Sequence, residues 1–227
     1  MSGAAALKRQ AAEAALADVS SGMRVGLGSG STARIMVELL GDRVRAGLRV
    51  VGVPTSEGTA ALAREVGITL AELADVEELD LTIDGADEVN TATLDLIKGL
   101  GGALVREKIV AAASKRMTVI VDSSKLVPRL GGVRLPVEVV RFAWQATDRH
   151  LRRLGAETVL REGGDGAPFV TDNGNHILDC RLAIDDPQGI DRAIGRIPGV
   201  VETGLFIGMA TKVVVGTQDG PHILERE

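Results

Sequence analysis

Apolar and polar positions along the first half of the chain predict strands and helices in alternation. The predicted strands are residues 23–27, 48–53, 79–84 and 117–121. The predicted helices are residues 4–19, 56–66 and 103–114, with one more that follows Thr32. Strands that alternate with helices favour a mostly parallel, doubly wound α/β sheet of the Rossmann-like kind.

The pattern changes after residue 130. The expected elements are strand 136–142, helix 144–154, strand 157–162, a run at 169–182 split by the hairpin signal Asn173-Gly174-Asn175, helix 188–197 and strand 200–206. We therefore expect a smaller α+β, ferredoxin-like insertion domain at residues 130–203. Residues 211–217 form a buried-strand run that should rejoin the first sheet, so residues 1–129 and 204–227 are expected to form one catalytic α/β domain.

The composition of the chain limits the classes of binding partner that we expect. The net charge of −5 includes no run of like charges, and only 2% of residues are aromatic, so we expect neither nucleic acid nor a membrane as partner. No stretch reaches the ~18 apolar residues of a membrane span. The single cysteine, Cys180, cannot form an intrachain disulfide, which fits a reducing compartment. We expect a cytoplasmic protein.

The segment Gly26–Thr32 (GLGSGST) lies where a strand meets a helix. Its glycines allow close approach of a ligand, and free N–H groups at a helix start favour an anion, with hydroxyls of Ser29, Ser31 and Thr32 as further donors. The alternative is a tight turn with a capping hydroxyl. A dinucleotide fingerprint fits less well, because Ser31 occupies the third glycine position and the next strand ends at Pro54. A sugar phosphate suits the loop better.

Three carboxylates follow the strand at residues 79–84, in the turn that ends at Glu88. Ligands bind at this edge of open α/β sheets, so Asp84 and Asp87 are candidates for holding sugar hydroxyls and exchanging protons with them. The alternative is a solvated turn in which Asp84 caps the chain. Glu88 is expected to contribute least.

Residues 98–108 join a lysine, a glycine-rich turn and a helix. A carboxylate at Glu107 can remove a proton α to a carbonyl, and Lys98 can stabilise the resulting oxyanion. The alternative for Glu107 is a helix-dipole interaction or a surface salt bridge. Arg106 and Lys108 are expected to be exposed helix charges.

Together these segments resemble type A ribose-5-phosphate isomerase. The motifs are GLGSGSTA, TIDGADEV, IKGLGGALVREKIV, VDSSK, LPVEV, TDNGN and VVVGTQDG, in that order over nearly the whole chain. Two positions depart from the family pattern: Ser29 stands where threonine is usual, and Leu100 interrupts the glycines after the lysine.

The resemblance implies a set of site residues. Substrate contacts would be Ser29, Gly30, Ser31, Thr32, Asp84, Gly85, Ala86, Asp87, Lys98, Gly99, Leu100, Gly101 and Lys125. Glu107 would be the proton acceptor, with Asp84, Lys98 and Asp87 as further catalytic residues. It implies no cofactor and no metal, and a homodimer or a dimer of dimers.

The expected reaction is the interconversion of D-ribose 5-phosphate and D-ribulose 5-phosphate through an enediolate. Two alternatives stay open at this point. One is another phosphosugar isomerase, such as an amino-sugar isomerase-deaminase. The other is a sugar-phosphate-binding regulator without catalysis.

Overall fold

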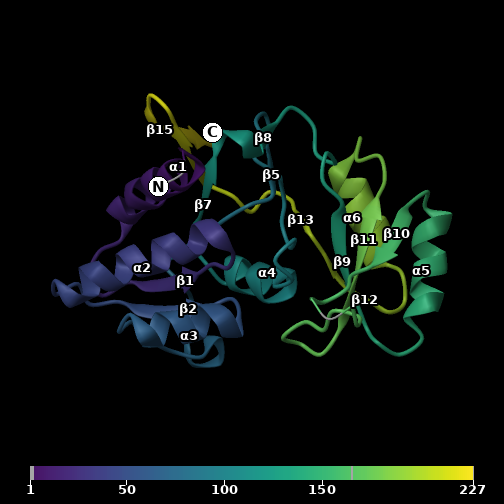
Figure 1. The fold of residues 1–227 in the computed structure, drawn as a ribbon, viewed down its shortest axis with the longest axis horizontal. Coiled ribbons are helices and arrows are strands. Elements are labelled where there is room, and N and C mark those ends of the chain that lie inside the picture. Colours follow the sequence, from purple (N-terminus) through teal and green to yellow (C-terminus); the bar gives the residue numbers. More distant parts are fainter. Residues whose placement is uncertain (1–2, 165, 227) are drawn as a thin grey trace.

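The computed structural model describes residues 3–164 and 166–226, and its largest sheet has seven strands (Figure 1). The strands are β1 (Arg24–Leu27), β2 (Val51–Pro54), β3 (Thr69–Leu70), β4 (Leu81–Asp84), β7 (Met117–Asp122), β14 (Lys212–Thr217) and β15 (Gly220–Glu225). Their order is β15-β14-β7-β4-β1-β2-β3, and every neighbouring pair is parallel except β14 with β15. The predicted α/β fold, including the return of residues 211–217 to this sheet, is confirmed.

Helices cover both faces of the large sheet. They are α1 (Gly3–Ala15), α2 (Ser31–Arg45), α3 (Glu57–Glu65) and α4 (Leu104–Ala112), with short 3-10 turns η1 (Leu16–Asp18), η2 (Leu73–Asp75) and η3 (Ser123–Lys125). Within β7, Ile120 packs in the apolar cluster that includes α1 and α2, whereas Val119 packs in the cluster that includes Ala111 of α4. Both faces of the strand are therefore buried, as in parallel sheets generally.

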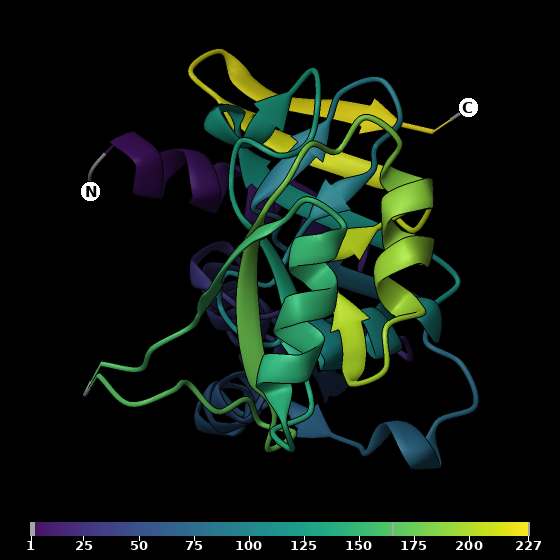
Figure 2. The ribbon, with the colours of Figure 1, turned by 90° about the vertical axis from the view of Figure 1, so that its right-hand side faces the viewer.

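A second sheet of four antiparallel strands lies beside the first. It comprises β9 (Leu135–Val139), β10 (Glu157–Leu160), β11 (His176–Arg181) and β12 (Val200–Thr203), in the order β10-β11-β9-β12, with helices α5 (Trp144–Arg153) and α6 (Pro187–Gly195). Both helices cover one face (Figure 2), and Val137 packs with them. This is the expected ferredoxin-like plan. The domain boundaries at residues 130 and 203 stay a prediction.

A third, small sheet was not predicted. Its strands are β5 (Glu88–Asn90), β6 (Leu96–Ile97), β8 (Leu126–Val127) and β13 (Leu205–Phe206). The predicted strand 200–206 is therefore wrong as one element: it divides at Gly204 between two sheets. A Cβ at Gly204 would lie 2.3 Å from the carbonyl oxygen of Lys98, so the chain bends where it meets the main chain of the candidate site.

Two further details differ from the sequence prediction. The first half of the run 169–182 is not a strand, and residues 171–175 form a turn closed by the Thr171 N–H and the Asn175 carbonyl at 3.0 Å. The sequence did not predict strand β15. The strand contains Pro221 and its side chains are mostly exposed, so its residues show no buried-strand pattern. Within residues 3–164 and 166–226, no helix has the length and apolar character needed to cross a membrane.

Candidate active site

The turn between β1 and α2 is a glycine loop whose main chain approaches a carboxylate. A Cβ at Gly28 would lie 2.2 Å from Asp84 Oδ1, so only glycine fits. Gly30 has φ +94°, and α2 begins directly after it at Ser31. The Ser29 N–H donates to Asp84 Oδ1 at 3.1 Å. The loop thus brings the start of α2, with its free amides, beside the carboxyl end of β4.

The Ser29 hydroxyl lies in a cluster of hydroxyl groups at the start of α3. It donates to Ser56 Oγ at 2.7 Å, and its oxygen lies 2.8 Å from Thr55 Oγ1 and 3.1 Å from Thr59 Oγ1. Thr59 Oγ1 in turn donates to the carbonyl of Gly28 at 3.0 Å. The Ser29 side chain therefore anchors the glycine loop to α3.

Asp84, Lys98 and Glu107 form a buried cluster of three charged side chains. The Lys98 ammonium lies 3.0 Å from Asp84 Oδ2 and 3.3 Å from Glu107 Oε2, and none of the three side chains is more than 5% exposed. The ammonium also donates to the carbonyl of Gly85 at 2.6 Å and lies 5.4 Å from the centre of the Phe206 ring. One cation therefore faces two carboxylates.

This imbalance perturbs the titration of the cluster. Burial raises the pKa of Glu107 to about 8; the Lys98 ammonium opposes the shift and the Asp84 carboxylate adds to it. Burial also raises the pKa of Asp84, against the effect of Lys98 and of N–H donors from Gly85 and Ser29. For Lys98, burial favours the neutral amine, but the two carboxylates outweigh it and raise the pKa. Lys98 stays charged, while Glu107 titrates near neutral pH, where a general base is most effective.

The turn after Lys98 accommodates the unusual leucine. Gly99 and Gly102 have φ values of +102° and +87°, whereas Leu100 has no positive φ. The Leu100 N–H donates to Asp87 Oδ2 at 2.9 Å, and its side chain is 42% exposed. The leucine therefore leaves the glycine-dependent positions of the turn intact.

These segments surround a cavity of about 110 Å³. Its lining residues are Lys8, Ser29, Gly30, Ser31, Thr32, Gly85, Ala86, Asp87, Lys98, Gly99, Gly101, Glu107 and Lys125. Two predicted contacts, Asp84 and Leu100, do not line the cavity. Asp84 is fully buried and meets the lining only through Lys98 and main-chain amides, and the Leu100 side chain points to solvent while its N–H binds Asp87.

Lys8 is a lining residue that sequence reasoning missed. Its ammonium donates to Ser31 Oγ at 2.9 Å, from a helix 23 positions earlier in the chain. The sequence of residues 4–19 predicted only a surface helix. No sequence pattern relates a lysine in such a helix to the glycine loop. Only the packing of α1 on α2 brings the two together.

Three charged residues near the site have structural partners that the sequence did not indicate. Glu88 is 4% exposed and accepts the N–H groups of Gly131 and Val133 at 2.8 and 2.7 Å, so it holds a loop. The expectation that Arg106 and Lys108 are exposed helix charges is wrong, because their side chains are only 32% and 15% exposed and both are paired. Lys108 pairs with Glu202 of β12 at 2.8 Å.

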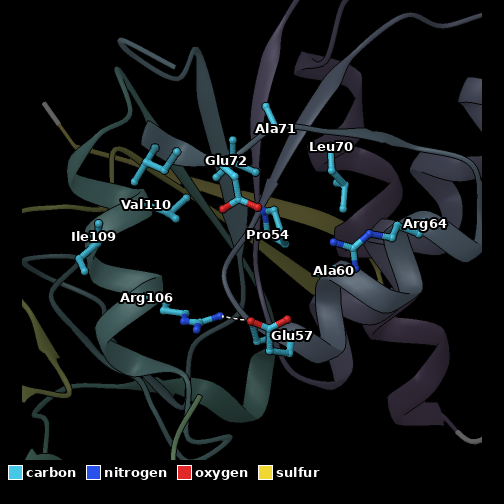
Figure 3. Close-up of a pocket in the computed structure, with 13 residues that line it drawn as sticks. Pro54, Glu57, Ala60, Arg64, Leu70, Ala71, Glu72, Arg106, Ile109 and Val110 are labelled. Carbon is cyan, nitrogen blue, oxygen red and sulfur yellow. Dashed lines mark hydrogen bonds and ion pairs between the residues drawn. The ribbon is translucent and has the colours of Figure 1, made fainter. Parts of the chain in front are cut away.

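Arg106 lines a different cavity, of about 250 Å³, between α3 and α4 (Figure 3). Its guanidinium pairs with Glu57 at 2.7 Å, and Arg64 and Glu72 lie around the same space. This cavity is lined by two acidic and two basic side chains, and none of the predicted site residues lines it. Lys98 and Glu107 of the charged cluster line the smaller cavity instead.

Metal-ligating side chains do not gather anywhere in the described residues: no group of three or more His, Cys, Asp or Glu could hold a metal ion. What the smaller cavity does contain is a carboxylate that titrates near neutral pH, a charged lysine beside it, and two further lysines, Lys8 and Lys125, near a helix start. This arrangement can move a proton on an anionic substrate.

Known proteins share the sequence and the fold. The family described as Ribose 5-phosphate isomerase A (phosphoriboisomerase A) matches residues 51–220. A curated "Ribose-5-phosphate isomerase A" of Gloeobacter violaceus is 58% identical, covering 96% of this chain and 95% of that protein. The solved ribose 5-phosphate isomerase A of Methanocaldococcus jannaschii superposes with a TM-score of 0.94 at 43% identity, covering 97% and 98% of the two chains. A solved D-ribose-5-phosphate isomerase in complex with phospho-erythronic acid superposes with a TM-score of 0.95 at 40% identity, covering 98% and 99%.

Proposed function

The chain belongs to the ribose 5-phosphate isomerase A family, and we propose that its Glu107 cavity is where it interconverts D-ribose 5-phosphate and D-ribulose 5-phosphate. The reaction belongs to the non-oxidative pentose phosphate pathway. The observation that carries the assignment of the site is the Asp84-Lys98-Glu107 cluster: a buried carboxylate with a raised pKa beside a permanent cation.

Glu107 is the base that carries a proton between the two reacting carbons. In the open-chain aldose, C2 bears a hydrogen next to the C1 aldehyde, and the ionised carboxylate removes it to give a cis-enediolate. The same carboxyl group then returns the proton to C1. The hydroxyl proton of the C2 oxygen passes to the negative C1 oxygen, so that C2 becomes the ketone and C1 carries the alcohol. Lys98 stabilises the negative oxygen of the enediolate, because its ammonium lies 3.3 Å from the base and is shielded from water.

The two aspartates have different roles. Asp87 lines the cavity and is held by the Leu100 N–H, so it orients substrate hydroxyls. Asp84 keeps Lys98 charged and in place. Since Asp84 does not line the cavity, its catalytic part, assistance to opening of the furanose ring, is exerted through the Lys98 ammonium.

The phosphate lies at the start of α2. Ser31 and Thr32 provide hydroxyls and free amides there, and the helix dipole favours a negative charge. Lys8 and Lys125 supply cations from α1 and η3. Binding energy from the phosphate positions the reacting carbons against Glu107.

The chemistry needs neither a metal nor an organic cofactor, because one carboxyl group both removes the proton from C2 and delivers a proton to C1.

We also propose a cytoplasmic enzyme that forms a homodimer or homotetramer. An apolar pair on the surface, Val140 and Phe142, is 38% and 89% exposed and supports self-association. Sedimentation at micromolar concentration tests the oligomer, and a purely monomeric protein would contradict it.

The substitution Glu107→Gln tests the assignment, since it removes the base and keeps the shape. Ketose formation from D-ribose 5-phosphate should fall to below a tenth of the wild-type rate, with unchanged folding by circular dichroism. The matched control Glu38→Gln changes an exposed glutamate of α2 and should keep full activity. Glucosamine 6-phosphate serves as the competing substrate: ammonia release from it would favour the isomerase-deaminase alternative.

A further inference from the structure

The glycine turn that follows Lys98 is held from outside the cavity by Arg161, which directly follows β10 of the second sheet. Arg161 Nη1 donates to the carbonyl oxygens of Gly99 and Leu100 at 2.9 and 3.0 Å. Arg161 follows β10, about sixty positions later in the chain, and its side chain is only 13% exposed. The end of β10 thus contacts the main chain of the active site directly.

A carboxylate fixes this arginine in place. Asp179 of β11 accepts from Arg161 Nε at 2.9 Å with one oxygen and from Nη2 with the other. The pair is bidentate and largely buried, which makes it stronger and more directional than a surface ion pair. The third nitrogen of the guanidinium is therefore left pointing at the turn.

Phe169 packs against the same turn at Gly102. A Cβ at Gly102 would lie 2.6 Å from the tip of the Phe169 ring, and the Arg161 guanidinium lies 6.0 Å from the centre of that ring. The N–H of Phe169 donates to the Arg161 carbonyl at 2.8 Å. Arginine, ring and turn form one packed unit.

The direction of the two carbonyls decides where the amides point. In a trans peptide the C=O and the following N–H point to opposite sides. Because the Leu100 carbonyl faces Arg161, the Gly101 N–H faces away from Arg161. Gly101 lines the cavity, and its N–H donates to no group in the described part of the chain. By the same geometry, the Gly99 carbonyl on Arg161 leaves the Leu100 N–H on Asp87.

We propose that Arg161, held by Asp179, is a positioning residue for the isomerisation. It holds the 99–101 peptides so that the Gly101 N–H and the Asp87 carboxylate present themselves to the substrate. A lysine cannot replace it, since an ammonium lacks the planar fork that binds a carboxylate and two carbonyls at once. This inference rests on the proposed function of the cavity.

The test compares Arg161→Lys and Asp179→Asn with a matched control. Arg152→Lys is that control, because Arg152 pairs with Asp148 at 2.9 Å and donates to the Thr158 carbonyl at 3.0 Å, in the same small unit but without a contact to the turn. Each variant is assayed for kcat and KM with D-ribose 5-phosphate, for inhibition by phospho-erythronic acid, and for melting temperature.

We expect Arg161→Lys to lose on the order of 10- to 100-fold in kcat/KM, as misplaced active-site groups do. Asp179→Asn should show a smaller loss, and the double variant should lose no more than Arg161→Lys alone. Inhibition by phospho-erythronic acid should weaken in parallel. The melting temperature should fall further than in the Arg152→Lys control, because the Arg161 pair is more buried, but both variants should stay folded at the assay temperature and the control should keep its activity.

Three results would overturn the inference: activity of Arg161→Lys within threefold of wild type, an equal loss in the control, or additive losses in the double variant. If Arg161→Lys does not fold, Asp179→Asn decides alone, and wild-type kcat/KM in that variant overturns the inference. The pH at which kcat/KM is half-maximal should not move, because Arg161 contacts neither Lys98 nor Glu107. A wild-type enzyme without turnover would instead contradict the proposed function itself.

Discussion

Raising the pH from 7 to 10 should increase kcat/KM for D-ribose 5-phosphate, because the proposed base holds a proton at neutral pH. Burial raises the pKa of Glu107 to about 8, and the Lys98 ammonium that faces it must also balance Asp84. Asp84 accepts two main-chain N–H groups, which oppose the rise in its pKa that burial causes.

The size of the effect follows from the ionised fraction. With a pKa of about 8, roughly one Glu107 in ten is ionised at pH 7, so kcat/KM should rise ~10-fold to a plateau above pH 9. The second pKa of a phosphate ester is near ~6, so the substrate is already a dianion over this range and does not cause the rise.

The assay is the initial rate of ketose formation at low substrate, from pH 7 to 10. A flat profile would refute the reasoning, because an ordinary glutamate is fully ionised throughout.

The raised pKa of Glu107 also affects the stability of the fold. The raised pKa stabilises the fold fully below the unfolded value of 4.5, and that contribution is lost as the pH rises through about 8. Wild type should therefore lose melting temperature relative to Glu107→Gln between pH 5 and 9, and parallel curves would contradict the shift.

Four other substitutions have distinct expected outcomes. Lys98→Met should abolish turnover and lower the melting temperature, because it leaves two buried carboxylates without a cation; a folded variant with wild-type kcat would contradict the cluster. Lys8→Met and Lys125→Met should raise KM on the order of tenfold with a smaller change in kcat, whereas the surface control Lys115→Met should change neither. Glu88→Gln should cost about 1–3 kcal/mol of unfolding free energy by weakening its bonds to two main-chain amides while kcat stays near wild type, and denaturant titration with the standard assay measures both.

Much of the large sheet could be predicted because its strands are continuous apolar runs that end in recognisable turns. Asp84 ends β4, and Glu107 lies in the connection that leads from β4 to its parallel neighbour β7. Such a connection starts at the carboxyl edge of the sheet, where open α/β sheets bind their ligands. The structure brings both side chains to Lys98 as that argument requires. The roles of these residues in catalysis stay predictions until the substitutions are measured.

The parts that could not be predicted depend on contacts between distant segments. The two-residue strands of the small sheet carry no periodic pattern, so the division of residues 200–206 at Gly204 could be seen only once Lys98 lay against it. Likewise, Lys8 and Arg161 reach the site from a helix and a strand end whose local sequence indicates ordinary surface charges.

The most direct test of the central claim is the isomerisation of D-ribose 5-phosphate in D₂O, with the product analysed by NMR. A carboxyl group that carries the proton through an enediolate exchanges it with solvent, so the ribulose 5-phosphate should contain deuterium at C1, and Glu107→Gln should give neither product nor exchange. Wild-type turnover without any deuterium at C1, or labelled product from Glu107→Gln at more than a tenth of the wild-type rate, would contradict the assignment of Glu107 as the base.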